Sequence, residues 1–378
     1  MNSVPNLRLE DDLATVEFVK RNGYYRVGDL NYNFKINALE SATKLNLPVQ
    51  WEYNTDIYRN LNWRQSTGVS LTTLYQNRAE QLRNQYDYLV LAFSGGSDSY
   101  TVLRSFIDND IHLDEIVCDW PLKQTENLTV STDCRPENYN SEWSLAIKPV
   151  LDYVRQYHPK IKITVTDSLQ KLSNEDYEDT CTVTQIHNYV SIKRYRKILK
   201  RLQELSDQHR RVGLVLGIEK PKMHIEKNIF CVYFSDEHCW IKSSIDNHER
   251  NVEYFYWTPD MPEIVLEQAH VVYRYLLENK NAVSILFSTG LARNFVKSLI
   301  YSKWNPAVFQ ADKGNSLIYN EQYAWFFTQT KTTEIQSWES SMTSRLNIVD
   351  QKYLEFFPDG RFQGYKSFYS RLYPVGII

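Results

Sequence analysis

The residues best suited to bind a charged ligand are Ser94-Gly95-Gly96-Ser97-Asp98-Ser99. They follow an apolar run and precede a helical pattern, so the two glycines can turn the backbone sharply and present successive N–H groups. The helix that follows adds partial positive charge at its N-terminus, and the serine hydroxyls can donate further hydrogen bonds. Phosphate or pyrophosphate is the natural ligand of such a loop.

Two common phosphate-binding loops do not fit these residues. A Walker A loop requires a Gly-Lys pair, which is missing after Gly96, and the dinucleotide fingerprint requires G-x-G-x-x-G spacing. Glycine is also scarce, with 12 residues among 378, or about 3% against the usual ~7%. The single adjacent pair in such a chain indicates a local backbone requirement.

The S-G-G-x-D-S pattern resembles the loop of the PP-loop ATP pyrophosphatases, the adenine nucleotide alpha hydrolase-like superfamily that includes asparagine synthetase, GMP synthetase and PAPS reductase. The resemblance covers roughly residues 88–221. It implies a Rossmann-like fold, ATP and Mg²⁺ as cofactors, and cleavage of ATP between the α and β phosphates. A substrate oxygen, from a carboxylate or a nucleobase, would be adenylated and the activated group then transferred to an amine.

The resemblance also implies roles for single residues. Asp98 would be catalytic, holding Mg²⁺ or orienting the loop, and the rest of the motif would cradle pyrophosphate. The residues expected to border the adenosine lie at the ends of two predicted strands: Ala92, Phe93, Cys118 and Asp119. On the residues alone, the alternative is a serine- and glycine-rich helix cap without a ligand.

A second loop, Leu216-Gly217-Ile218-Glu219-Lys220-Pro221, follows another predicted strand. Gly217 would let the backbone approach the nucleotide, Glu219 would ligate Mg²⁺, and Lys220 would neutralise pyrophosphate charge during catalysis. The alternative is an ordinary strand exit with surface charges. Ligand binding is favoured because strand ends at this edge of a parallel sheet are where ligands bind.

The elements that must position these loops alternate along the chain. Strands are predicted at residues 88–93, 115–119, 160–166 and 212–217, and helices at 71–85, 142–157, 185–205 and 262–277, with a further helix through 102–107. The first strand is apolar throughout, as expected of a parallel strand buried on both faces. In the first helix, Arg78, Glu80 and Arg83 fall on the wetter side. The predicted fold class is α/β, a parallel twisted sheet with a mainly helical C-terminal region.

A shift in composition near residue 225 divides the chain. The predicted organisation is an N-terminal extension of unassigned structure (1–70), an ATP-binding α/β domain (71–225) and a mixed, mostly helical substrate or interaction region (226–378). Within the last region, a hairpin is predicted between residues 229–234 and 239–241. The aromatic cluster at residues 254–257 is interpreted as part of a core rather than as a surface that stacks on a base.

Composition also bears on compartment and partners. The first 12 residues lack the basic and apolar segments of a secretory signal, no apolar run can span a bilayer, and the five cysteines form no C-x-x-C pair. A reduced cytoplasm is expected, and it would be the host cytoplasm if the chain is phage-encoded, since parts of the sequence resemble PP-loop proteins of bacteriophages. No membrane partner is expected, and a homo-oligomer is left open.

The acceptor substrate is not specified by any motif; a nucleotide or a nucleic acid is one alternative. The net charge of −3 gives no general attraction to nucleic acid. The basic helix at 185–205, with Lys193, Arg194, Arg196 and Lys197, would bind an acidic partner or be a solvated outer helix, and the second interpretation is favoured. Two other functions are weighed: a sulfur-transfer or PAPS reductase-like enzyme that uses Cys118, and a non-catalytic protein that binds ATP or AMP.

Overall fold

The computed structural model describes most of the α/β region and parts of the flanking regions. The described residues are 23–32, 44–120, 142–166, 201–208, 211–218, 222–236, 250–281, 296–301 and 368–378, with the single residues 38, 41, 42, 122 and 304. None of the helices within these residues is long and apolar enough to cross a membrane.

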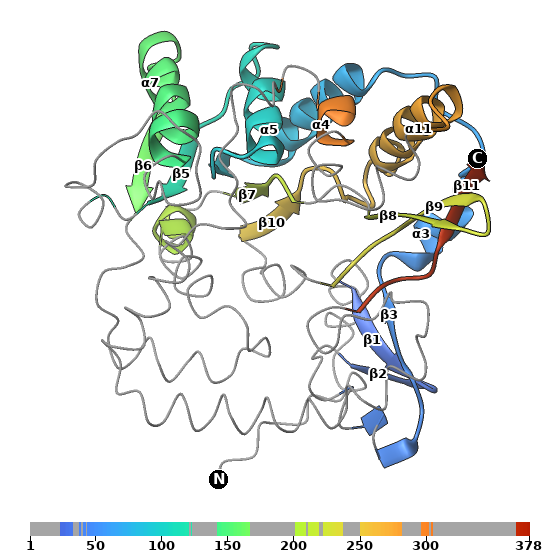
Figure 1. Ribbon diagram of the computed structural model, residues 1–378. Coiled ribbons are helices and arrows are strands. Elements are labelled where there is room, and N and C mark those ends of the chain that lie inside the picture. Colours follow the sequence, from blue (N-terminus) through green and yellow to red (C-terminus); the bar gives the residue numbers. More distant parts are fainter. Residues whose placement is uncertain are drawn as a thin grey trace.

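A five-stranded parallel sheet forms the centre of the fold (Figure 1). Its strands are β4 (Tyr88–Ala92), β5 (Glu115–Asp119), β6 (Lys162–Thr166), β7 (Val212–Leu216) and β10 (Arg250–Tyr254). The order across the sheet is β10-β7-β4-β5-β6, and every neighbouring pair is parallel. The four strands predicted for this region are confirmed, and the fold is an α/β fold of the Rossmann-like kind.

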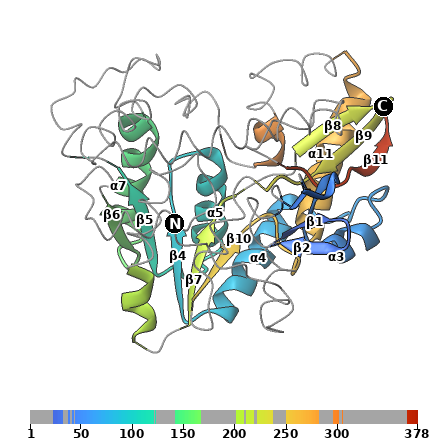
Figure 2. The same ribbon diagram turned by 90° about the horizontal axis from the view of Figure 1, so that it is seen from below.

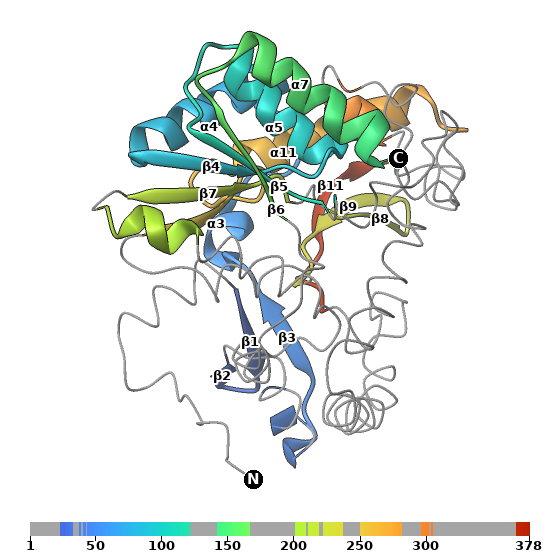
Figure 3. The same cartoon turned by 90° about the vertical axis from the view of Figure 1, so that its left-hand side faces the viewer.

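Helices cover this sheet, mainly on one face. They are α4 (Leu71–Gln85), α5 (Ser97–Ile107), a π-helical turn (Glu142–Ile147) that continues into α7 (Lys148–Tyr157), and α11 (Glu263–Glu278). Figure 3 shows α4, α5, α7 and α11 above the sheet and the helical turn at 201–206 below it. That turn is the end of the basic helix predicted at 185–205, whose remaining residues, Lys193, Arg194, Arg196 and Lys197 included, lie outside the described part.

The chain reverses direction across the sheet at β4. From β4 it passes to β5 and β6 on one side, and it then returns to add β7 and β10 on the other side of β4, as seen from below in Figure 2. In open α/β sheets a crevice forms at such a switch point, outside the carboxyl ends of the strands. The topology therefore places the end of β4, next to the end of β7, where a ligand is expected.

Two small antiparallel sheets lie beyond the β10 edge (Figure 2). One has the order β2-β1-β3, from Leu30–Tyr32, Tyr24–Val27 and Val49–Glu52, and the other has the order β11-β9-β8, from Tyr373–Ile377, Ile229–Tyr233 and Lys222–Glu226. The predicted strand at 229–234 exists, but it does not pair as the predicted hairpin requires; residues 239–241 lie outside the described part. Both edges of β9 are already occupied, by β8 across a turn at Lys227–Asn228 and by the C-terminal strand β11.

Aromatic side chains join these sheets into one core. Tyr58 and Phe234 lie 4.5 Å apart between ring centroids, and Trp63 stacks on Tyr373 at 5.0 Å. The cluster predicted to be core, residues 254–257, is buried throughout. Short helix α3 (Thr55–Asn60) supplies Tyr58, so the N-terminal extension is part of this core.

The described residues beyond 225 include the strands β9, β10 and β11 as well as α11. Most of residues 226–378 lie outside the described part, so the prediction of a mainly helical region stays a prediction. One of the described strands, β10, belongs to the main sheet, so that sheet draws on residues from both sides of position 225. A strand can join a parallel sheet beside a strand that is not next to it in the sequence, and β10 joins beside β7.

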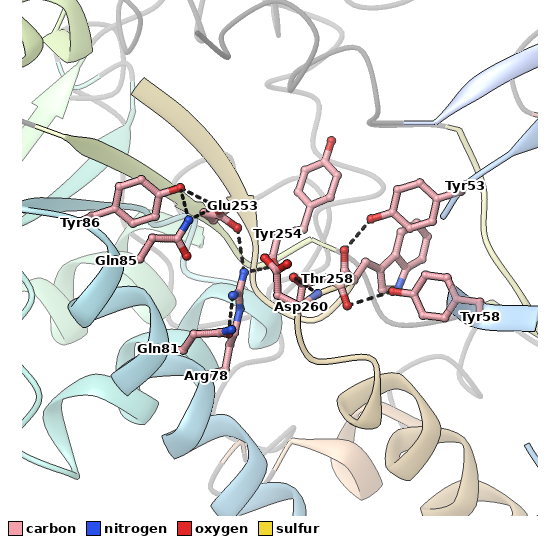
Figure 4. Close-up of polar contacts among 11 residues, drawn as sticks. Tyr53, Tyr58, Arg78, Gln81, Gln85, Tyr86, Glu253, Tyr254, Thr258 and Asp260 are labelled. Carbon is pink, nitrogen blue, oxygen red and sulfur yellow. Dashed lines mark hydrogen bonds and ion pairs between the residues drawn. The ribbon is translucent and has the colours of Figure 1, made fainter. Parts of the chain in front are cut away.

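The buried guanidinium of Arg78 ties α4 to the edge strand β10 (Figure 4). Arg78 is fully buried, which corrects its predicted place on the wetter side of the helix. Its Nη2 lies 2.8 Å from Glu253 Oε2 and also donates to the carbonyl of Tyr254 at 3.2 Å. The hydroxyl of Tyr86 donates to the other carboxylate oxygen of Glu253 at 2.5 Å, so the buried carboxylate is bonded through both oxygens.

Replacing Arg78 by methionine is expected to lower the free energy of unfolding by about 3–5 kcal/mol, because the carboxylate of Glu253 would stay buried without its cation. Arg155→Met is the control, since Arg155 pairs with Asp152 on the surface with both side chains about half exposed. That change is expected to cost about 1 kcal/mol or less. Urea denaturation of both variants measures the difference, and equal losses would contradict the role given to the buried pair.

A second buried carboxylate belongs to the first residue of β5. Glu115 is fully buried and accepts hydrogen bonds from Thr164 at 2.6 Å, Tyr88 at 2.9 Å and Arg201 at 3.1 Å. Burial alone would raise the pKa of Glu115, but these hydrogen bonds outweigh it and hold the pKa below its ordinary value of 4.5.

Because the pKa of Glu115 is lower in the folded than in the unfolded state, its contribution to stability is present above about pH 4.5 and is lost as the pH falls through the folded-state value. Glu115→Gln is therefore expected to be less stable at neutral pH and to lose less stability on acidification than the unmodified protein. Urea denaturation across the acid range measures both. Parallel curves for the two proteins would show that Glu115 does not titrate in this way.

Candidate functional site

The Ser94–Ser99 loop lies at the carboxyl end of the central strand β4. Sheet hydrogen bonding continues one residue beyond the strand, where the Phe93 N–H donates to the carbonyl of Val117 at 2.8 Å. Helix α5 then begins at Ser97, with Gly96 as its N-cap and no side chain capping it. The N–H groups of a first helical turn have no intrahelical acceptor. The predicted strand–loop–helix setting is confirmed.

Gly95 adopts a left-handed backbone conformation, with φ of +72°. A Cβ atom at this position would lie 2.6 Å from Cγ1 of Ile147, in the π-helical turn before α7. Glycine is therefore required here for two reasons: the positive φ angle, and the lack of room for a Cβ beside Ile147. The loop is backed by the π-helical turn, and its course is set by that packing.

The serines of the loop differ in their surroundings. Ser99 Oγ accepts a hydrogen bond from the N–H of Ser94 at 3.2 Å and donates to the carbonyl of Gly96 at 3.2 Å, which closes the loop on itself. Ser97 is only 2% exposed, and its hydroxyl has no hydrogen-bond partner among the described residues. Buried hydroxyls are normally bonded, and this one lies beside a helix N-terminus, where it can donate to a ligand.

Gly217 lies against the same helical turn from the other side of β4. A Cβ at Gly217 would lie 2.8 Å from the backbone nitrogen of Ser99 and 2.9 Å from the carbonyl carbon of Asp98. The predicted role of this glycine is to let the backbone approach a nucleotide. The atoms it approaches are instead those of α5, so the absence of a side chain lets the β7 exit contact the first turn of that helix.

The carboxylate of Asp98 is held by two residues from a distant part of the chain. Its Oδ1 accepts a hydrogen bond from the Tyr301 hydroxyl at 2.5 Å, and its Oδ2 lies 3.3 Å from the ammonium of Lys297. The backbone carbonyl of Asp98 accepts from the Tyr256 hydroxyl at 2.8 Å. Of the two roles expected for Asp98, this geometry favours orienting the loop over presenting a free carboxylate to a metal.

The segment 296–301 that supplies these residues is firmly packed. Ile300 and Tyr301 are fully buried, and the Ile300 carbonyl accepts a hydrogen bond from Tyr75 of α4 at 2.8 Å. Burial, together with the charge of Asp98, raises the pKa of Tyr301 well above its ordinary value, so this tyrosine remains a proton donor at neutral pH. Nothing local in the sequence marks Lys297 or Tyr301, which lie about 200 residues after the loop.

The residues expected to border the adenosine divide into two groups. Phe93 and Cys118 are buried, and for Cys118 this fits the interpretation as a small core residue rather than an exposed nucleophile. Ala92 and Asp119 are partly exposed, and Asp119 accepts a hydrogen bond from Thr166 at 2.9 Å.

Two predicted residues of the second loop, Glu219 and Lys220, lie outside the described residues. Within the described part, no three His, Cys, Asp or Glu side chains are grouped as a metal site would require. Among the described residues, the carboxylate of Asp98 does not favour a Mg²⁺ ligand, because both of its oxygens are engaged, one of them by a cation. The same residues do fit an anion, since a hydroxyl, an ammonium and a helix N-terminus all adjoin the loop.

No protein-family model matches this sequence, and a search of curated proteins finds no match either.

Gly95→Ala and Gly68→Ala form a matched pair, because both glycines have φ of +72° but a Cβ at Gly68 would meet nothing within 4 Å. The backbone strain alone is expected to cost about 1–2 kcal/mol in each variant. The contact with Ile147 is expected to add about 1–3 kcal/mol at Gly95 only. Urea denaturation measures the difference, and equal stabilities would show that the loop can move away from the π-helical turn.

Proposed function

We propose that the chain is an ATP pyrophosphatase of the PP-loop type, with the Ser94–Ser99 loop as the binding site for the pyrophosphate moiety of ATP. The observation that supports this most directly is the position of the complete S-G-G-x-D-S motif at the switch point of a parallel sheet, between β4 and the N-terminus of α5. Motif and topology are independent of each other, and both favour a phosphate ligand here.

The charges around the loop also favour a polyanion. The α5 N-terminus carries partial positive charge, Lys297 brings a full charge beside it, and Ser97 has a buried hydroxyl to donate. Asp98 is the opposing negative charge among the residues described at the loop, and it is paired with Lys297. An anion with several negative charges would use all of these donors.

The reaction we propose has two steps. A substrate oxygen attacks the α-phosphorus of ATP, the bond from that phosphorus to the oxygen shared with the β-phosphate breaks, and pyrophosphate leaves with the shared oxygen. An amine then attacks the adenylated group, AMP leaves with the substrate oxygen, and the amine proton passes to solvent. The protein's part is to hold the pyrophosphate and align the α-phosphorus with its attacker.

A carboxylate or a nucleobase oxygen is the acceptor we propose, and an amine the nucleophile. A sulfur-transfer reaction that uses Cys118 is less well supported, because this thiol lies fully buried within β5. ATP is the cofactor that the loop geometry favours. No step of the proposal depends on a metal held by Asp98.

The reaction is tested with α-labelled ATP and candidate carboxylate, nucleoside and amine substrates, followed by separation of AMP from ADP. AMP and pyrophosphate are expected in equal amounts. Formation of ADP alone would show that the protein cleaves the β–γ bond. Tight ATP binding without pyrophosphate release from any substrate would indicate a nucleotide-binding protein without catalysis.

Ser97→Ala is expected to weaken pyrophosphate binding about tenfold or more, because a hydrogen bond to a charged group contributes about 1.5–3 kcal/mol. Ser105→Ala is the matched control, since Ser105 lies in the same helix with its hydroxyl bonded to the carbonyl of Thr101 at 2.7 Å. Isothermal titration calorimetry with inorganic pyrophosphate measures both variants. Equal affinities would place the anion elsewhere.

A further inference from the structure

Both oxygens of the Asp98 carboxylate already have a partner, and one of these partners is a cation. Tyr301 donates to one oxygen at 2.5 Å, and the Lys297 ammonium lies 3.3 Å from the other. Mg²⁺ binds carboxylate oxygens at about 2.0–2.1 Å and requires nearly octahedral geometry around it. A dication at this carboxylate would therefore have to displace Lys297 or lie beside a like charge.

Lys297 is held in place rather than free to leave. Its side chain is 13% exposed, and it is one turn from Tyr301, which is fully buried. The ring of Tyr301 packs on that of Tyr256 at 5.3 Å between centroids, and Tyr75 bonds the carbonyl of Ile300. The ammonium is thus fixed beside the first turn of α5, on the side of Asp98.

A lysine ammonium has three N–H donors, and the contact with Asp98 uses one of them. The others can donate to an anion in the loop. Asp98 compensates the charge of Lys297 while the loop is empty, and its carboxylate, bonded to Tyr301, keeps the ammonium in one position. The arrangement brings to the loop the N–H donors of a cation whose charge Asp98 balances.

We propose that Lys297 is an anion-binding residue of this site, that Asp98 is its positioning residue, and that the loop binds pyrophosphate without a divalent ion ligated by Asp98. This inference rests on the proposed function, because it takes the Ser94–Ser99 loop to be the pyrophosphate site.

The test is isothermal titration calorimetry of the full chain with inorganic pyrophosphate, in EDTA and in Mg²⁺. The dissociation constants under the two conditions are expected to agree within about threefold. Lys297→Met is expected to weaken binding in EDTA about tenfold or more, and Lys297→Arg to retain most of the affinity because it keeps the charge. Lys280→Met, at an exposed lysine after α11, is the control and is expected to bind normally.

Asp98→Asn separates a positioning residue from a metal ligand. As a positioning residue, Asp98 affects affinity equally in EDTA and in Mg²⁺, so the ratio of the two dissociation constants is expected to match that of the unmodified protein. As a metal ligand, it would affect binding only when Mg²⁺ is present. Asparagine can still accept the hydrogen bond from Tyr301, and a thermal unfolding curve checks that the variant remains folded.

Two results would overturn this inference while the proposed function stands: pyrophosphate binding that requires Mg²⁺, and binding in EDTA that Lys297→Met does not weaken. The first is measured on the unmodified protein and does not depend on any variant folding. Absence of binding under both conditions would instead overturn the proposed pyrophosphate site, and the inference with it. The failures of the two proposals are therefore distinguishable.

Discussion

The arrangement of the candidate site depends on close backbone contact between the β7 exit and the first turn of α5. Gly217 makes this contact possible, because any side chain there would overlap the backbone of Asp98 and Ser99. Gly95 meets the π-helical turn before α7 in a similar way. The loop between β4 and α5 consequently packs closely on two sides, against the β7 exit and against the π-helical turn. This packing fixes the direction of its backbone N–H groups.

The first turn of α5 is also held by hydrogen bonds from two tyrosines. The hydroxyls of Tyr256 and Tyr301 both donate to Asp98, one to its carbonyl and one to its carboxylate. Burial raises the pKa of both tyrosines well above their ordinary value, so each stays protonated and remains a donor. Tyr75 of α4 donates to the carbonyl of Ile300, next to Tyr301, and so connects these tyrosines to α4.

The buried pair of Arg78 and Glu253 has its effect on the site through these tyrosines. It joins α4 to the end of β10, and Glu253 lies three residues before Tyr256 (Figure 4). A buried ion pair is weak evidence for added stability, but its geometry admits few alternatives. The pair holds the carboxyl end of β10 against α4, and β10 in turn pairs with β7.

The sequence by itself determined four of the five parallel strands, the helices α5 and α7 and the Ser94–Ser99 loop, because apolar periodicity and glycine placement are local signals. It did not reveal that Arg78 is buried, since a charged residue on a helix is solvated unless a distant carboxylate meets it. Nor did it reveal Lys297 and Tyr301, whose partner lies about 200 residues away and leaves no trace in their own neighbourhood. Only the tertiary structure decided what surrounds Asp98, because the groups that contact this side chain come from segments far away in the sequence.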